Sequence, residues 1–166
     1  ITILVALTVS TVVLITLVCW DLRRTSASLA WSSAMSASTD IERATGLLES
    51  QVDAPERPFF TNSLFIELFN AAFDEHNLEN KDDAFHLMHT ARQLLLDYQE
   101  YDPYKRDVQI NLFRTEILLS NWGQTDFTEQ AVHRAERIFK LYPAYLSMLQ
   151  IVADDMRFVG RDDLAD

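Results

Sequence analysis

The stretch AVHRAERIFKLYPAY, residues 131–145, decides the fold. Its apolar side chains recur every three or four residues, the spacing of one face of an α-helix. The residues that share this face are Ala131, Ala135, Ile138 and Phe139. Pro143 follows directly, and a helix ends at or before the residue that precedes a proline. The stretch therefore predicts an amphipathic helix that is closed by a proline turn.

A second stretch, AFHLMHTARQLLLDYQEYDPY at residues 84–104, repeats this pattern. Ala91 precedes Pro103 by the same interval by which Ala131 precedes Pro143. Leu95 and Tyr98 occupy the matching offsets in between. A third amphipathic segment covers residues 40–55, and the closing prolines Pro58, Pro103 and Pro143 recur at similar intervals. Self-similarity at a period of roughly 20–50 residues is typical of stacked helical repeats.

The composition of the whole chain also favours helices. Of 166 residues, 48% are hydrophobic and 23% are charged, and only 3 are Gly and 4 are Pro. These values exclude disordered, collagen-like and Gly-looped chains, so we expect an all-α fold. The net charge of -11 argues against nucleic acid as a partner, because nucleic-acid-binding proteins carry basic patches.

The stretch ITILVALTVSTVVLITLVCW, residues 1–20, contains no charged side chain. Twenty helical residues span about 30 Å, the thickness of the hydrocarbon core of a bilayer. We therefore predict a transmembrane helix at residues 1–20, in contact with membrane lipid, followed by a helical stalk at 21–39. A cleaved signal peptide is the rival, but the run is longer than the usual apolar region and lacks a basic start. Arg23 and Arg24 favour a cytoplasmic location for the soluble part.

Capping signals predict where the remaining helices begin. Thr39 with Glu42 and Asp126 with Glu129 have the spacing of capping boxes, and Asp102 precedes Pro103 as an N-cap precedes a first-turn proline. These signals place helix starts near residues 40, 103 and 126. A further helix is expected to open at Asn62 or Ser63, and residues 77–83 to form a polar turn.

The helical stretches at 84–104 and 131–145 resemble the second helix of a tetratricopeptide repeat, with its small, bulky and small residues before a proline. Residues after Pro143 also match the large, large, small and aromatic positions of the first helix of this repeat: Leu149, Val152, Ala153 and Met156. Gly160 falls at the turn between helices, and Ala165 where the next second helix opens. Residues 108–119 fit the first-helix pattern poorly. The resemblance implies that residues 40–166 form a solenoid of degenerate repeats, with Ala131, Ala135 and Ala153 at close helix contacts.

The order of membrane span, basic doublet, Ala/Ser-rich stalk and repeats is similar to the C-terminal tail of bacterial O-antigen ligase and polymerase family membrane proteins. Its segments DPYKRDVQINLFRTEILLSNWG and LYPAY carry this likeness. The resemblance implies a plasma-membrane parent that transfers lipid-linked glycan, with its catalytic residues outside this chain. A single-pass scaffold protein without a link to glycan transfer is an alternative, and a four- to six-helix bundle without repeats is another.

Polar residues of the best-matched unit are the candidates for partner binding. After packing positions are assigned, Gln150, Asp154 and Arg157 remain along one side of the last helix, where they either contact a protein partner or glycan chain in a groove or face water. The sequence contains no nucleotide-binding, metalloprotease or hydrolase motif, and it predicts no catalytic residue and no cofactor.

Two other clusters have ordinary structural explanations. His86 and His89 are spaced to face one metal ion, but a zinc site needs three or four convergent ligands. The tyrosines at 98, 101 and 104, next to Lys105 and Arg106, have the chemistry to bind a sugar or peptide. Tyrosines that cap a turn between repeats are the more common case.

Overall fold

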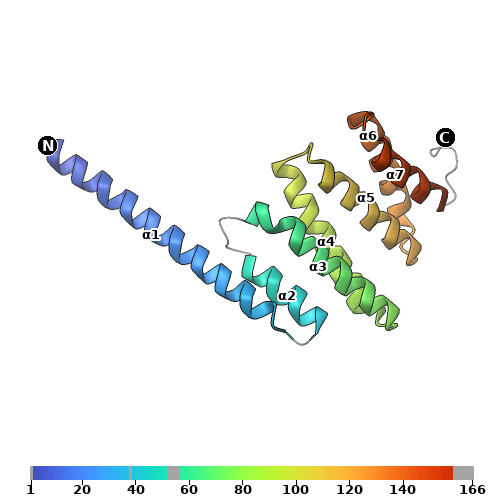
Figure 1. Ribbon diagram of the computed structural model, residues 1–166, viewed down its shortest axis with the longest axis horizontal. Helices are drawn as coiled ribbons and strands as arrows, with labels where there is room; N and C mark the ends of the chain where they lie inside the picture. Colours follow the sequence, from blue (N-terminus) through green and yellow to red (C-terminus); the bar gives the residue numbers. More distant parts are fainter. Residues whose placement is uncertain (1, 38, 52–56, 159–166) are drawn as a thin grey trace. The chain divides into compact units, whose positions relative to one another are not determined.

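The computed structural model describes the backbone of residues 2–37, 39–51 and 57–158 and the side chains of 8–37, 39, 42–49 and 61–157. This part of the chain consists of seven helices and contains no strand (Figure 1). The all-α prediction is confirmed. The helices are α1 (Thr2–Ala34), α2 (Asp40–Gln51), α3 (Arg57–Asn77), α4 (Lys81–Tyr101), α5 (Arg106–Asn121), α6 (Asp126–Leu141) and α7 (Leu146–Phe158). They form two compact units, residues 1–60 and 61–166.

The first unit contains α1 and α2, which pack against each other. α1 runs without a break through the predicted span and most of the predicted stalk, and it ends at Ala34 rather than 39. α2 begins where the capping box predicts, because the Glu42 backbone N–H donates to the Thr39 hydroxyl oxygen at 3.2 Å. The two helices approach closely at Gly46, where an added Cβ would lie 2.9 Å from the Cβ of Ala34.

Most of the large apolar side chains of α1 are exposed within the described structure. Those from Val9 to Leu22 are each at least half exposed. Among the residues described here, no helix combines the length and the apolar character that a membrane crossing requires. The side chains of residues 1–7 lie outside the described part. The span at residues 1–20 stays a prediction.

The second unit arranges its helices in two layers. α5 packs against α4, α6 and α7. α3 lies along α5, since the Asn111 side chain donates to the Asn62 side chain at 3.2 Å near one end and the rings of His76 and Trp122 stack at 4.2 Å near the other. These contacts run in the same chain order, so α3 and α5 point the same way. One layer therefore contains α3, α5 and α7, and the other contains α4 and α6.

Helix boundaries in this unit repeat at the interval that separates Pro103 from Pro143. α4 ends at Tyr101 and α6 at Leu141, whereas α5 begins at Arg106 and α7 at Leu146. The turns between these helices also have the same hydrogen bonds, from Asp102 N–H to Tyr98 O and from Tyr142 N–H to Ile138 O, both at 2.9 Å. Buried residues recur at the same interval, as in the pairs Ala91 and Ala131, Val108 and Met148, Leu112 and Val152, and Glu116 and Met156. The internal repeat seen in the sequence is thus also a repeat of geometry.

Two predicted helix starts are wrong. α5 begins at Arg106 and not at 103, because Asp102 and Pro103 belong to the preceding turn. The Asp102 carboxylate accepts from the Tyr104 backbone N–H at 3.3 Å, and the Asp102 carbonyl accepts from that of Lys105 at 3.2 Å. α3 begins at Arg57 rather than at 62 or 63, because a proline is compatible with the first turn of a helix.

The predicted start of α6 near residue 126 is correct, but the predicted capping box of Asp126 with Glu129 does not form. Thr125 is the N-cap and makes no side-chain capping bond. The first backbone N–H groups are satisfied by backbone carbonyls instead, with Phe127 N–H donating to Gln124 O and Thr128 N–H to Thr125 O, both at 3.0 Å. The predicted polar turn at 77–83 is shorter than expected, because α3 ends at Asn77 and α4 begins at Lys81.

Candidate functional site: a groove between α3 and α5

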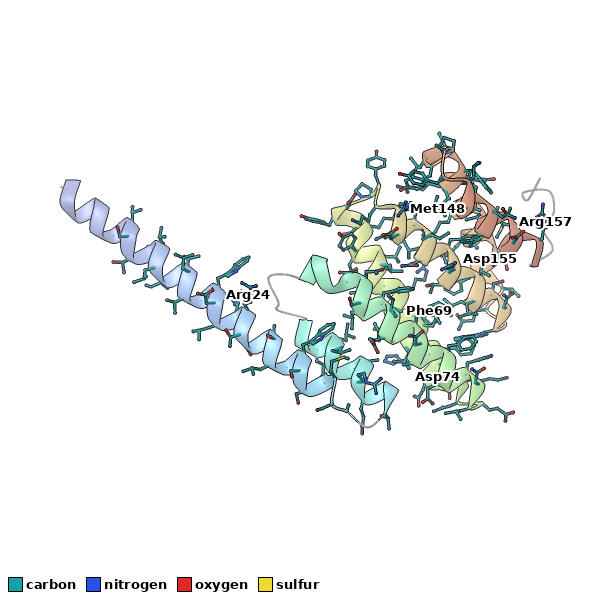
Figure 2. The ribbon with its side chains drawn as sticks, in the orientation of Figure 1. Arg24, Phe69, Asp74, Met148, Asp155 and Arg157 are labelled. Atoms are coloured by element: carbon teal, nitrogen blue, oxygen red, sulfur yellow. The ribbon has the colours of Figure 1, made fainter. Side chains whose placement is uncertain are left out.

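A groove lies between α3 and α5 in the second unit. Its volume is about 370 Å³. The residues that line it come from the two helices that point the same way: Asn62, Phe65, Ile66, Phe69 and Asn70 on α3, and Asp107, Ile110, Asn111 and Arg114 on α5. Figure 2 labels Phe69 on α3. The groove thus crosses the layer of α3, α5 and α7 between neighbouring helices.

The lining of the groove combines apolar and hydrogen-bonding side chains. Ile66 is 45% exposed, and Phe69 and Ile110 are half-buried. Asn62 and Asn111 bind each other across the groove. Within the described part of the chain, the side chains of Asn70 and Arg114 form no hydrogen bond. An amide and a guanidinium that line a groove without a hydrogen-bond partner are available to a ligand.

The residues predicted to bind a partner lie on α7. Gln150, Asp154 and Arg157 are all exposed, and Asp154 pairs with Arg157 at 3.0 Å between Oδ1 and Nη1. None of them lines the groove between α3 and α5. The internal repeat nevertheless makes Gln150 and Asp154 the equivalents of Ile110 and Arg114, which do line it. Arg157 is the equivalent of buried Ile117, so the repeat separates it from the other two.

Asp155 is an acidic residue of α7 that the sequence analysis did not single out. It is half-buried, and Figure 2 labels it on α7 near Arg157. Burial raises the pKa of its carboxyl group above the ordinary value, and the nearby positive charge of Arg114 opposes this effect. The nearby charges of Asp155 and Arg114 connect α7 electrostatically to the groove-lining face of α5.

Sequence analysis also missed the most deeply buried charged group among the described residues of the second unit. Glu116 on α5 is fully buried, and its carboxylate accepts from two guanidinium groups. Arg134 on α6 donates from Nε at 2.8 Å and from Nη2 at 3.0 Å. Arg92 on α4 donates from Nη2 at 3.2 Å. One carboxylate therefore joins three helices.

Three glutamine side chains extend this cluster. Gln130 accepts from Arg92 at 2.7 Å, and Arg134 donates to Gln99 at 3.1 Å and to Gln109 at 3.3 Å. We call Glu116, the two arginines and these glutamines the Glu116 cluster. It explains why residues 108–119 fit the repeat pattern poorly, since buried polar residues there replace apolar ones. Arg134 therefore lies within this cluster and is only 12% exposed.

A signal for Glu116 was present in the sequence. Alignment of the two repeats on Pro103 and Pro143 places Glu116 opposite Met156, a predicted packing residue. A charged residue at a packing position needs buried partners of opposite charge. The identity of those partners depends on the packing of α4 and α6, which spacing along one helix does not give.

The predicted packing residues are confirmed in most cases. Ala131 and Ala135 are fully buried in a cluster with Phe113, Ile138 and Val152, and Met156 belongs to the same cluster. Leu149 packs on its edge, and Ala153 is half-buried. The predicted turn at Gly160 and the predicted helix start at Ala165 lie outside the described residues.

The two histidines considered as metal ligands are exposed on α4. The ring of His89 lies 5.5 Å from that of Phe127 on α6. Among the described residues, no three His, Cys, Asp or Glu side chains gather in a way that would hold a metal ion. A contact with a neighbouring helix accounts for His89.

Comparison with known proteins identifies no relative of this chain. No protein family, no curated protein and no solved structure matches the chain. The likeness to the O-antigen ligase tail stays a prediction that rests on the layout of the sequence.

Proposed function

We propose that this chain is a tetratricopeptide-like interaction module that residues 1–20 tether to a membrane. In this proposal the groove of the layer α3, α5 and α7 binds a protein partner or a glycan chain. The observation that carries it is the repetition of helix ends, proline turns and buried positions at one constant interval. Stacked helical repeats of this kind leave an extended surface along one helix layer.

The groove has the mixed chemistry of a binding surface. Apolar side chains at Ile66, Phe69 and Ile110 supply area that a partner can cover, and Asn70 and Arg114 supply hydrogen bonds. Apolar walls with a few polar groups are typical of ligand sites. The equivalent positions Gln150 and Asp154 extend the same surface along α7.

The tether is supported by α1, whose large apolar side chains from Val9 to Leu22 have no cover in the described structure. Arg23 and Arg24 follow the apolar stretch and support a cytoplasmic position for the second unit. A parent protein of the bacterial plasma membrane that transfers lipid-linked glycan is the context that we propose from the sequence layout.

Site-specific photocrosslinking tests the binding surface. A photoreactive amino acid is placed at Ile66, Ile110, Gln150 or Asp154, and at the exposed outer positions Glu129 and His133 as controls. We expect the four inner positions to capture the same partner and the two outer positions to capture none. Equal capture from both sets, or capture from neither, contradicts the proposal.

The tether and its orientation are tested separately. In a Cys19→Ser background, a cysteine at exposed Ser147 serves as the reporter of the second unit. An impermeant thiol reagent added to intact cells should leave it unlabelled and should label it after lysis. Extraction of the chain from membranes by carbonate contradicts the tether, and labelling in intact cells contradicts the cytoplasmic location.

A further inference from the structure

Aromatic side chains gather at the two proline turns of the second unit. All five tyrosines of the chain lie in or next to these turns, and Leu146 stands beside them: Tyr98, Tyr101, Tyr104, Tyr142 and Tyr145. Three of the rings are strongly exposed, with values of 75% for Tyr101, 68% for Tyr104 and 49% for Tyr145, and Leu146 is 76% exposed. Tyrosine is enriched in protein–protein interfaces, because its ring covers a large area at a low entropic cost. We call the five tyrosines and Leu146 the tyrosine surface.

Contacts between the two turns hold this surface in one arrangement. The Tyr142 hydroxyl donates to the Tyr104 carbonyl at 2.7 Å, which joins the α6–α7 turn to the α4–α5 turn. The guanidinium of Arg106 at the start of α5 lies 5.0 Å from the centre of the Tyr145 ring. Because neighbouring repeats fix these side chains, the surface is formed before a partner arrives, and little affinity is lost in ordering it.

Charged side chains border the tyrosine surface, and the two signs dominate different helices. The last turns of α4 are acidic, because Asp97 and Glu100 are exposed there and no basic residue occurs between positions 93 and 104. The last turns of α6 are basic, because Arg137 and Lys140 are exposed and no acidic residue occurs between positions 137 and 153. Glu136 precedes this basic run, and its carboxylate lies 3.7 Å from the ring of His133.

The charges of the whole border nearly cancel. The start of α5, which packs against both α4 and α6, has both signs, and its Arg106 pairs with Asp107 at 3.1 Å. A near-neutral border is not drawn as a whole to a polyanion or a polycation, so its pattern and not its sum selects the partner. The border consists of five acidic and four basic residues: Asp97, Glu100, Asp102, Asp107 and Glu136, and Lys105, Arg106, Arg137 and Lys140.

We infer that the tyrosine surface is the interface of a homodimer with two-fold symmetry. A two-fold axis between the ends of α4 and α6 brings the acidic end of α4 in one copy against the basic end of α6 in the other, and does so twice. The surface is therefore complementary to itself in charge. The exposed rings and Leu146 are covered at the centre, and the charged residues form the polar rim that surrounds such a centre.

Cysteine crosslinking tests the dimer on the full chain, purified in a nonionic detergent and in a Cys19→Ser background. A single cysteine replaces exposed Ala144 in the α6–α7 turn, which leaves every ring of the surface in place. The matched control is a cysteine at Leu78, which is 74% exposed in the α3–α4 turn at the other end of α4. A bismaleimide joins two copies where identical positions lie close together, as they do near a two-fold axis. We expect covalent dimers from position 144 and none from position 78.

Charge reversal tests the pairing of α4 with α6 across the axis. Glu100→Lys or Lys140→Glu alone places like charges against each other on both sides of the axis and should lower the yield of dimer from position 144 by about tenfold. The double variant restores opposite charges and should restore the yield. Glu129→Lys, at an exposed residue in the first turn of α6, is the control and should leave the yield unchanged.

The remaining outcomes overturn the interface. They are the absence of dimers from position 144, equal yields from positions 78 and 144, and a yield from 144 that neither single reversal lowers. Single reversals that lower the yield without recovery in the double variant also contradict the pairing of α4 with α6. The dimer depends neither on the tether nor on a ligand in the groove, so its failure leaves the proposed function in place.

Discussion

The Tyr142 hydroxyl donates a hydrogen bond to the backbone carbonyl of Tyr104 at 2.7 Å. The two residues belong to proline turns of successive repeats, in regions far apart along the chain. Each turn already satisfies its own backbone, with Lys105 N–H bound to Asp102 O and Tyr145 N–H to Tyr142 O. The tyrosine hydroxyl therefore adds a bond between repeats and fixes their relative position at this end of the unit.

Replacement of Tyr142 by Phe should lower the free energy of unfolding by about 1 kcal/mol, the net value of one hydrogen bond. Chemical denaturation measures this. Tyr101→Phe, at a ring that is 75% exposed, is the control and should change stability little. Burial raises the pKa of the Tyr142 phenol above 10, so the hydroxyl keeps its proton and the bond persists until the pH rises through that folded-state value. An equal effect of the two substitutions would argue against the bond between repeats.

Ala135 packs with no exposed surface among large neighbours of α5, α6 and α7. Ala135→Leu should therefore destabilise the second unit by about 1–3 kcal/mol through overpacking. The same change at exposed Ala144 should have little effect. An unfolding midpoint of Ala135→Leu equal to that of the parent would show that the helix contact assigned to this alanine is wrong.

The positions that sequence analysis predicted well are those that depend on one helix and its ends. The proline turns at 103 and 143 and the buried faces of Ala91, Ala131 and Ala135 follow from local spacing and local steric rules. The start of α5 was predicted too early in the chain because Asp102 next to Pro103 is compatible with both a helix cap and a turn. The structure distinguishes the two, because the helical hydrogen bonds of α5 begin only at its N-cap Lys105, whose carbonyl accepts from the Gln109 N–H.

The groove and the Glu116 cluster could not be predicted in the same way. Each requires side chains from helices that are far apart in sequence, such as Asn62 with Asn111 and Glu116 with Arg92. The periodicity of α7 left Gln150, Asp154 and Arg157 as polar positions, which are exposed in the structure, and their role in partner binding stays a prediction. It gave no information on which neighbouring helix would complete a groove, because such contacts depend on the packing of helices against one another.

Glu116→Gln should lower the free energy of unfolding by about 3 kcal/mol, because the two guanidinium groups would lose their shared buried counter-charge. Arg92 and Arg134 are only 18% and 12% exposed, so water replaces the lost contact poorly. Asp154→Asn is the control, since it breaks an exposed pair with Arg157 and should cost at most about 1 kcal/mol. If Glu116→Gln lowers the free energy of unfolding no more than the control does, the Glu116 cluster does not help to hold α4, α5 and α6 together.

Gly46 lies inside α2, where glycine weakens a helix by about 1 kcal/mol relative to alanine. It is needed there because an added Cβ would lie 2.9 Å from the Cβ of Ala34 on α1. Gly46→Ala should therefore fail to stabilise the pair of α1 and α2, whereas Gly46→Ala combined with Ala34→Gly should regain stability. Thermal unfolding followed by circular dichroism compares the three chains. A single Gly46→Ala variant that melts higher than the parent would exclude close contact at this point.

Asp155 should make the second unit less stable as the pH rises. Its carboxyl pKa is raised above 3.8 in the folded chain, chiefly by burial, so the folded state favours the protonated form. A group with a raised folded-state pKa stabilises the fold most at a pH below its unfolded-state pKa, and this contribution is lost as the pH rises through the folded-state pKa.

Asp155→Asn, which is neutral at every pH, should therefore raise the urea midpoint at pH 7 and change it less near pH 4. Asp154→Asn, at the neighbouring exposed residue, should instead lower the midpoint slightly at pH 7, because it removes the pair with Arg157. If Asp155→Asn lowers the midpoint at pH 7 as well, the attraction between the charges of Asp155 and Arg114 outweighs the cost of burying the carboxylate.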